Sequence, residues 1–161
     1  MDRRSLMLAL AGTPLLGAAV AEARGLRRGA GGALQALSAG EFSLESSRLA
    51  LRKARSPLVR QFAGLEAEEQ LAYARALGAA PGGAPVPPGK VAMLQRLQSL
   101  SGRSFDAAYV NGQIMGHREL LRINSSLSRG GASQVERSVA TVAVPAIKSH
   151  LAFLSQLRGL A

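Results

Sequence analysis

The spacing of apolar residues constrains the fold of this chain more than any other feature. In the C-terminal segment, apolar side chains recur at alternating intervals of three and four residues, which places them on one face of an α-helix. No segment shows the period-two alternation that is typical of a half-buried strand. The sequence therefore predicts an all-α fold. The residues on this C-terminal helical face are Ala140, Ala143, Ile147, His150, Leu154 and Leu157.

The composition agrees with a helical fold. Of the 161 residues, 47% are hydrophobic but only 4% are aromatic, so the core must be aliphatic, which suits packed helices. A chain of this length forms about one domain. It contains no cysteine, which excludes disulfides, thiolate metal sites and lipid-modified cysteines.

Capping signals predict where the helices begin and end. A Ser-x-x-Glu capping box at Ser38 predicts a first helix over 38–54. Ser56 followed by proline predicts the start of the second helix, which Gly78 ends. The other predicted helices are a short one over 90–100 and two long ones over 104–127 and 133–157, the last kinked or split at Pro145.

The connection between the second and third long helices is unusually long. Residues 78–89 are rich in glycine and proline and cannot carry a regular backbone ladder, so we expect a mobile crossover. The other two connections between long helices are short. This pattern predicts a four-helix bundle with one long crossover that carries a short extra helix.

The N-terminus has the pattern of a secretory signal peptide over residues 1–23. Arg3 and Arg4 precede an apolar run that ends in small residues, and we expect cleavage after Ala21 or Ala23. The arginine pair also fits a twin-arginine signal, and two ordinary positive charges are the alternative. The run is shorter than the roughly 20 residues of a membrane span. We therefore expect a periplasmic or otherwise exported protein with no transmembrane segment after cleavage.

Charge suggests a partner for the mature chain. Residues 24–36 contain glycine and arginine without a periodic apolar face, so we interpret them as a flexible basic arm before a helical domain over 37–161. The net charge of +10 favours an anionic envelope surface of lipid headgroups or cell-wall polymers, although such charges can also form a solvated helix face. Nucleic acid is disfavoured as a partner because export separates the protein from the usual nucleic-acid targets. The chain also has no recognised nucleic-acid-binding motif. The oligomeric state stays open.

Each long helix carries one polar residue on its predicted interior face. On the second helix, a stripe of alternating four- and three-residue spacing runs through Leu58, Phe62, Leu65 and Glu69. The heights of these polar groups can be compared by counting residues from the connecting turn, at about 1.5 Å per residue. By this count, the two polar groups of each helical pair differ in height by roughly one helical turn. The four polar groups are Glu45, Glu69, His117 and His150.

Two imidazoles and two carboxylates are a plausible ligand set for a single iron, zinc or manganese ion. The chain has no Glu-x-x-His motif, which excludes the di-iron centre of ferritin-like enzymes. Two other interpretations remain open. The groups can form a buried polar network that fixes helix register, or they can be unrelated, with Glu45 in a surface ion pair with Arg48.

Other chemistry has little support in the sequence. Asp106 lies in the first turn of a predicted helix, where its charge suits the helix dipole, so we assign it a structural role. There is no nucleophile-turn motif and no phosphate-binding loop. We therefore expect a non-catalytic, envelope-associated binding or stress-related protein whose biochemical function is unknown, with metal binding as the alternative.

Several segments resemble one known family. "GEFSLESSRLAL", "LSGRSFDAAYVNGQIMGH" and "VPAIKSHLAFL" resemble the helices of the bacterial exported proteins of domain of unknown function 4142, over about residues 35–158. The resemblance implies a ferritin-like helical bundle and an exported protein, but no reaction. Members usually carry an Asp-His pair where this chain has Glu69 and Gln70, so one histidine of a family-type metal site is missing.

Overall fold

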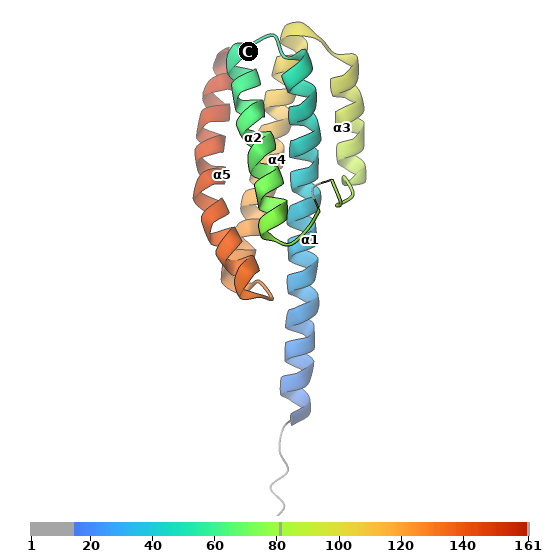
Figure 1. The fold of residues 1–161 in the computed structure, drawn as a ribbon, viewed down its shortest axis with the longest axis vertical. Helices are drawn as coiled ribbons and strands as arrows, with labels where there is room; N and C mark the ends of the chain where they lie inside the picture. The colour runs from blue at the N-terminus through green and yellow to red at the C-terminus, as the bar shows by residue number, and fades with distance from the viewer. Residues whose placement is uncertain (1–14, 81, 161) are drawn as a thin grey trace, which may run out of the picture.

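The computed structural model describes residues 15–80 and 82–160, with side chains described for 31–80 and 82–159. Within these ranges the chain is all-helical and contains no strand, which confirms the predicted fold class (Figure 1). Residues 1–14 of the predicted signal peptide lie outside the described ranges. The helices are α1 (Leu15–Lys53), α2 (Pro57–Ala76), α3 (Pro88–Ser99), α4 (Gly102–Gly130) and α5 (Gln134–Leu160).

The four long helices pack side by side, and α3 lies against α1 and α4 (Figure 1). One apolar cluster lies near the α1–α2 turn, around Phe62, Phe105 and Leu154. A second lies toward the other end of α4, around Leu120 and Ile147. Polar residues occupy the space between these clusters, and they form the candidate site described below.

Two of the predicted helix starts are confirmed by their caps. The Val59 backbone N–H donates to the Ser56 side chain over 3.4 Å at the start of α2. The Glu136 backbone N–H donates to Ser133 Oγ over 3.1 Å at the start of α5. Helix α5 is continuous across Pro145, so it is not split there, and the alternative of a kink stays a prediction. Pro145 lies on the exposed side of α5, where water can solvate the carbonyl that has lost its helical partner.

The predicted start of the first helix at Ser38 is wrong. Helix α1 continues through this position, and the segment 24–36, expected to be a loose arm, is helical. Tertiary packing explains the difference, because Ala36 and Ala39 are buried in the apolar cluster with α4 and α5 residues. Gly40 lies in the middle of this helix, where a Cβ would collide with the Gln70 side chain of α2. Its role is therefore close packing, and it caps no helix.

Asp106 has the structural role that the sequence predicts, but it serves a different helix. It is buried, and its two carboxylate oxygens accept hydrogen bonds from the backbone N–H groups of Arg55, at 3.0 Å, and Ser56, at 2.8 Å. These groups form the turn between α1 and α2. Asp106 thus fixes the start of α2, and with it the position of the α2 side chains in the candidate site.

Helix α5 carries more apolar side chains than the core buries. Within the described residues, one helix is long and apolar enough to cross a membrane, the stretch Gln134–Gly159 of α5, with mean hydropathy 1.3. Only 22% of its most apolar window is buried. Core helices also pass this test, and α5 contributes Ala140, Ile147 and Leu154 to the core. On the side facing α2, α5 leaves apolar surface exposed, including Val142.

Candidate metal centre

The interior face of α2 differs from the predicted one by about one residue. Val59, Phe62 and Glu66 are 0–2% exposed, whereas Leu58 is 44% exposed and Leu65 is 57% exposed. Phe62 fits both stripes, so periodicity alone did not separate them. The fully buried carboxylate of α2 is therefore Glu66, which the sequence analysis missed.

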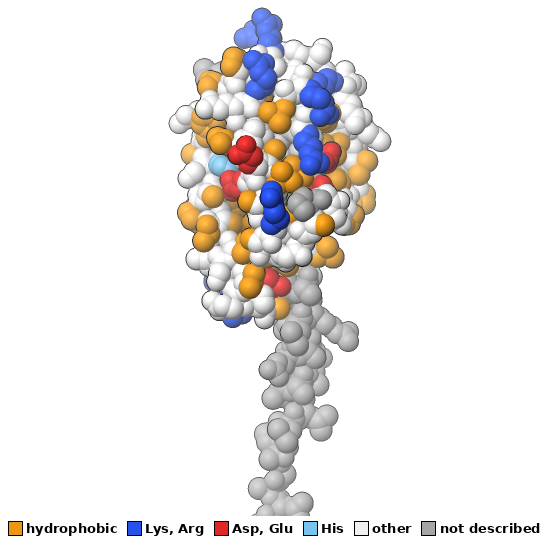
Figure 2. Space-filling view, in the orientation of Figure 1, with side chains coloured by type: hydrophobic (Ala, Val, Ile, Leu, Met, Phe, Trp, Pro, Cys, Tyr) orange, Lys and Arg blue, Asp and Glu red, His pale blue; other side chains and the backbone are white. Residues whose placement is uncertain are grey.

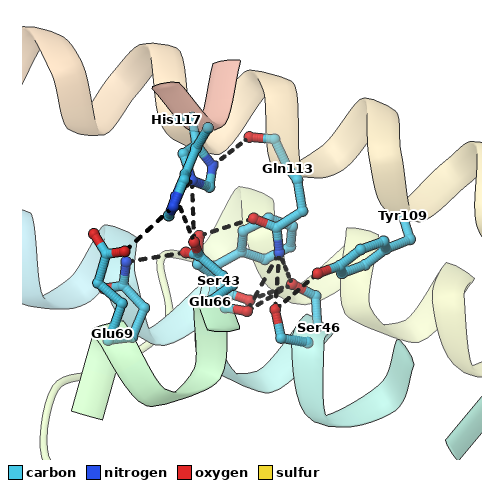
Figure 3. Close-up of polar contacts among 11 residues, drawn as sticks. Ser43, Ser46, Glu66, Glu69, Tyr109, Gln113 and His117 are labelled. Atoms are coloured by element: carbon cyan, nitrogen blue, oxygen red, sulfur yellow. Dashed lines mark hydrogen bonds and ion pairs between the residues drawn. The ribbon is translucent and has the colours of Figure 1, made fainter. Parts of the chain in front are cut away.

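Glu66, His117 and His150 bring three ligand-type atoms together. Glu66 Oε2 lies 3.2 Å from His117 Nε2 and 3.1 Å from His150 Nδ1. The two imidazole nitrogens are themselves 3.2 Å apart. The three atoms thus form a nearly equilateral triangle contributed by α2, α4 and α5. Figure 3 shows the carboxylate of Glu66 facing the ring of His117.

The outer atoms of the same side chains are held by other groups. His117 Nδ1 lies 2.9 Å from the carbonyl oxygen of Gln113, to which it donates, and His150 Nε2 lies 3.3 Å from Glu69 Oε2. Gln70 Nε2 donates to Glu66 Oε1 over 3.0 Å. The bond to a carbonyl fixes the tautomer of neutral His117, because its proton must be on Nδ1. In the neutral ring, the lone pair of His117 Nε2 faces the triangle.

Burial of these ionisable side chains raises the free-energy cost of charging them. Glu66 is fully buried and His117 is 1% exposed, and the Phe62 ring lies 5.9 Å from the His117 ring and 5.4 Å from the His150 ring, between centroids. Burial by itself would raise the pKa of Glu66. The charge of His117 and the hydrogen bonds from His117 and His150 outweigh it and lower that pKa to about 2. Glu66 is therefore ionised at neutral pH.

The neighbouring groups shift in the opposite direction. The hydrogen bond to Glu66 raises the pKa of His150 above its ordinary value, and the negative charges of Glu69 and Glu66 add to this effect against the cost of burial. Burial raises the pKa of Glu69, as does the charge of Glu66. With both outer nitrogens protonated and both rings neutral, three lone pairs would converge on one point. The triangle therefore needs a cation, which is either a proton on one of the two inner ring nitrogens or a metal ion.

The triangle has the dimensions of a metal site. Zinc–ligand distances of about 2.0–2.1 Å place the donors of a tetrahedral site about 3.3–3.4 Å apart, and an octahedral face gives slightly shorter separations. The three observed separations, 3.1, 3.2 and 3.2 Å, lie close to these values. The contacts from Gln113 and Glu69 to the outer nitrogens are those that orient metal-binding histidines. The residues present therefore fit a single ion.

Two of the four predicted ligands belong to this triangle, a third lies beside it, and the fourth lies elsewhere. His117 and His150 meet, and Glu69 contacts the outer nitrogen of His150. Glu45 lies on the surface of α1, where it pairs with Arg48 at 2.6 Å. Its assignment as a ligand is wrong, because the residues that α1 turns inward are the neighbouring serines. A surface ion pair was the open alternative for Glu45, and the structure contains it.

A buried polar network extends from the cluster between α1 and α4 as far as Tyr109. Gln113 Nε2 donates to Ser46 Oγ over 2.9 Å, and Ser47 Oγ lies 2.9 Å from the Tyr109 hydroxyl. Burial strongly raises the pKa of Tyr109 above its ordinary value, although its bond to Ser47 opposes this. Figure 3 shows Gln113 between the serines and His117. Gln113 thus connects α1 to the triangle of Glu66, His117 and His150. Its side chain contacts the α1 serines, and its carbonyl oxygen accepts a hydrogen bond from His117.

The fold and this cluster define a class: a helical protein whose core holds one carboxylate and two imidazoles within hydrogen-bonding distance. The chain belongs to the family described as domain of unknown function (DUF4142), whose model matches residues 17–157. This confirms the resemblance drawn from the sequence. Neither a curated protein nor a solved structure matches the chain.

Proposed function

We propose that this protein binds a single divalent transition metal ion, zinc, iron or manganese, through Glu66, His117 and His150. The observation that carries the proposal is the triangle of ligand atoms, whose three sides measure 3.1, 3.2 and 3.2 Å. Two imidazoles and one carboxylate are a common ligand set for these ions, and three protein ligands leave a position open for water or a substrate.

The outer contacts favour metal binding over a purely structural network. A structural network would only need the buried polar groups to be paired. Here each imidazole also has its outer nitrogen held by a separate acceptor, which directs the inner lone pair toward the shared point. Glu69 is better suited to orient His150 than to bind the ion, because its Oε2 contacts the outer nitrogen of that ring.

The proposal extends to the architecture and location of the protein. The α1–α2 and α4–α5 pairs, joined by a long connection that carries α3, support a ferritin-like four-helix bundle with one crossover. The N-terminal sequence supports export to the periplasm, with the signal peptide removed. The net charge of +10 supports contact with an anionic envelope surface. In this setting α5 stays in the bundle, because it supplies His150.

Metal titration tests the proposed function. The mature chain, without a histidine tag and stripped with a chelator, is titrated with Zn²⁺, Mn²⁺, Fe²⁺ and Co²⁺. We expect one equivalent to bind, and the visible spectrum of bound Co²⁺ reports whether the site is tetrahedral or octahedral. Glu66→Gln and His150→Gln keep side chains of similar size and should each weaken binding at least tenfold, in the range seen for loss of supporting contacts or more.

The matched control is Glu45→Gln, which removes an exposed carboxylate and should leave affinity unchanged. Circular dichroism confirms that each variant is folded. Absence of stoichiometric binding by the folded parent protein, or equal binding by the parent and Glu66→Gln, would overturn the proposal. Either result would leave the cluster as a structural polar network.

A further inference from the structure

An open apolar groove between α2 and α5 ends beside the triangle of Glu66, His117 and His150. It is open to solvent along one side and has a volume of about 470 Å³, within the roughly 300–1,000 Å³ range of small-molecule sites. Its walls are mostly alanine and valine side chains, together with Tyr73 and Ser138, and Val142 in this wall is 72% exposed. The residues that line it are Glu69, Ala72, Tyr73, Ala76, Ser138, Val139, Val142, Ala143 and Ala146.

The groove has a polar end and an apolar end. Glu69 contacts His150, so the groove approaches the triangle where α2 passes α5 near these two residues. From there it runs along α2 to Ala76 and along α5 back to Ser138. The α5 lining, Ser138 to Ala146, covers about 12 Å of helix, which is the length of a short hydrocarbon chain.

The charge of the groove is opposite to that of the whole chain. Glu69 is its single charged lining residue, and no lysine or arginine lines it, although the chain contains 20 basic residues. One carboxylate oxygen of Glu69 faces His150, yet the side chain remains 36% exposed, and that of His150 is 19% exposed. Figure 2 shows a histidine beside acidic side chains on this face, with hydrophobic side chains around them. A buried or half-buried carboxylate next to an apolar wall selects a cation with an apolar tail.

We propose that this groove binds a small aliphatic ammonium compound, with its charged head at Glu69 and its hydrocarbon chain along α5. The proposal goes beyond metal binding and does not depend on it, because neither the apolar wall nor Glu69 belongs to the three ligands. Apolar contact supplies the affinity, and the carboxylate selects a cationic head over a neutral or anionic one. A fatty acid of the same length would place its carboxylate against Glu69.

Calorimetry with n-octylamine, n-octanol and n-octanoate tests this site on the full mature chain, both chelator-stripped and zinc-loaded. We expect saturable binding of one octylamine in both forms, at least tenfold tighter than octanol, and no measurable binding of octanoate. Glu69→Gln should weaken octylamine binding about tenfold, while Glu68→Gln, an exposed neighbour on the same helix, should leave it unchanged. Ala146→Leu should block the groove, and Ala152→Leu, on an exposed position of α5, should not.

Three results would overturn the proposal while leaving the metal site intact. They are the absence of saturable octylamine binding, equal affinity for octanoate, and unchanged affinity in Glu69→Gln. Binding that occurs only with zinc present would place the head group on the metal and would also overturn the assignment to Glu69. Sedimentation of the same samples detects a second copy of the chain on this face, and dimerisation without octylamine binding would make the groove an interface. Metal titration of Ala146→Leu separates the two proposals, since this variant blocks the groove and keeps Glu69 and all three proposed ligands.

Discussion

Glu66 and Glu45 show how differently two carboxylates of one chain can behave. Both pair with a nitrogen base, Glu66 with His117 at 3.2 Å and Glu45 with Arg48 at 2.6 Å. The shorter pair lies on the surface, where the Glu45 side chain is 40% exposed, whereas Glu66 is fully buried. An exposed pair contributes at most about 1 kcal/mol, while loss of one partner of a buried pair leaves an uncompensated polar group. Burial, and not the length of the contact, gives the Glu66 cluster its importance.

Removal of Glu66 gives the largest expected effect. In the metal-free protein, Glu66→Ala should lower the free energy of unfolding by about 3–5 kcal/mol, because the proton held between the buried rings of His117 and His150 loses its carboxylate partner. Urea denaturation at pH 7 measures this. Glu45→Ala serves as the control and should change the free energy of unfolding by about 0–1 kcal/mol. Equal effects in the two variants would break the contrast between the buried and surface pairs.

Acid should weaken the buried cluster through Glu66 itself. Its pKa of about 2 in the folded protein is below the ordinary value of 4.5, so its contribution to stability is present above pH 4.5 and is lost as the pH falls toward 2. The loss is roughly 3 kcal/mol at most. Other carboxylates also titrate in this window, so the difference between the parent and Glu66→Gln, measured by urea denaturation from pH 5 to pH 2, isolates the effect. A pH-independent difference would contradict the ionised state of Glu66.

Two helical glycines test how firmly packing fixes Gln70, the side chain that donates to Glu66. A Cβ at Gly40 collides with Gln70, which donates to Glu66, whereas a Cβ at Gly64 only reaches ordinary contact with Leu51 at 3.9 Å. Gly40→Ala should therefore stabilise the protein less than Gly64→Ala, or destabilise it by up to about 1 kcal/mol, because the Gln70 amide must move and its hydrogen bond to Glu66 weakens. Gly64→Ala should stabilise it by about 0.5–1 kcal/mol. Thermal unfolding of the two variants compares them, and equal stabilisation by both would show that Gln70 can move without cost.

Alkaline pH should weaken the metal-free cluster by a smaller amount through His150. Its pKa is raised above 6.5 in the folded protein, so its contribution is present below pH 6.5 and is lost as the pH rises through the folded value. The parent should unfold at lower urea concentration at pH 9 than at pH 6, and His150→Gln should lose this dependence. A bound metal should remove it too, because the ion replaces the proton. The same pH dependence in His150→Gln would assign it to another group.

Local pattern was sufficient for much of the fold. Periodicity predicted the all-α class, and the apolar face of α5, with His150 on it, is buried or half-buried as predicted. The caps at Ser56 and Ser133 mark the predicted helix starts because each cap depends on residues within one turn. The long connection over 78–89 also follows from its own glycines and prolines, although α3 already begins at Pro88.

Contacts between distant segments decided the rest. Two stripes on α2 share Phe62 and have equally good spacing, and the choice of Glu66 over Glu69 as the buried carboxylate depends on how α2 is rotated against α4 and α5. Asp106 fixes the start of α2 from 50 residues away in the chain, through the Ser56 backbone. Helix α1 continues past its capping box because Ala36 and Ala39 pack against another helix.

The sequence by itself therefore determined the helical class, the family and the two histidines of the candidate site. Each of these depends on residue type or on spacing within one segment. Tertiary structure alone decided which carboxylate completes the site, that Glu45 does not, and that Glu69 joins the site to the apolar groove. The physical reason is that helix rotation is set by packing over the whole interface between helices, and a shift of one residue moves a side chain by about 100° around its axis.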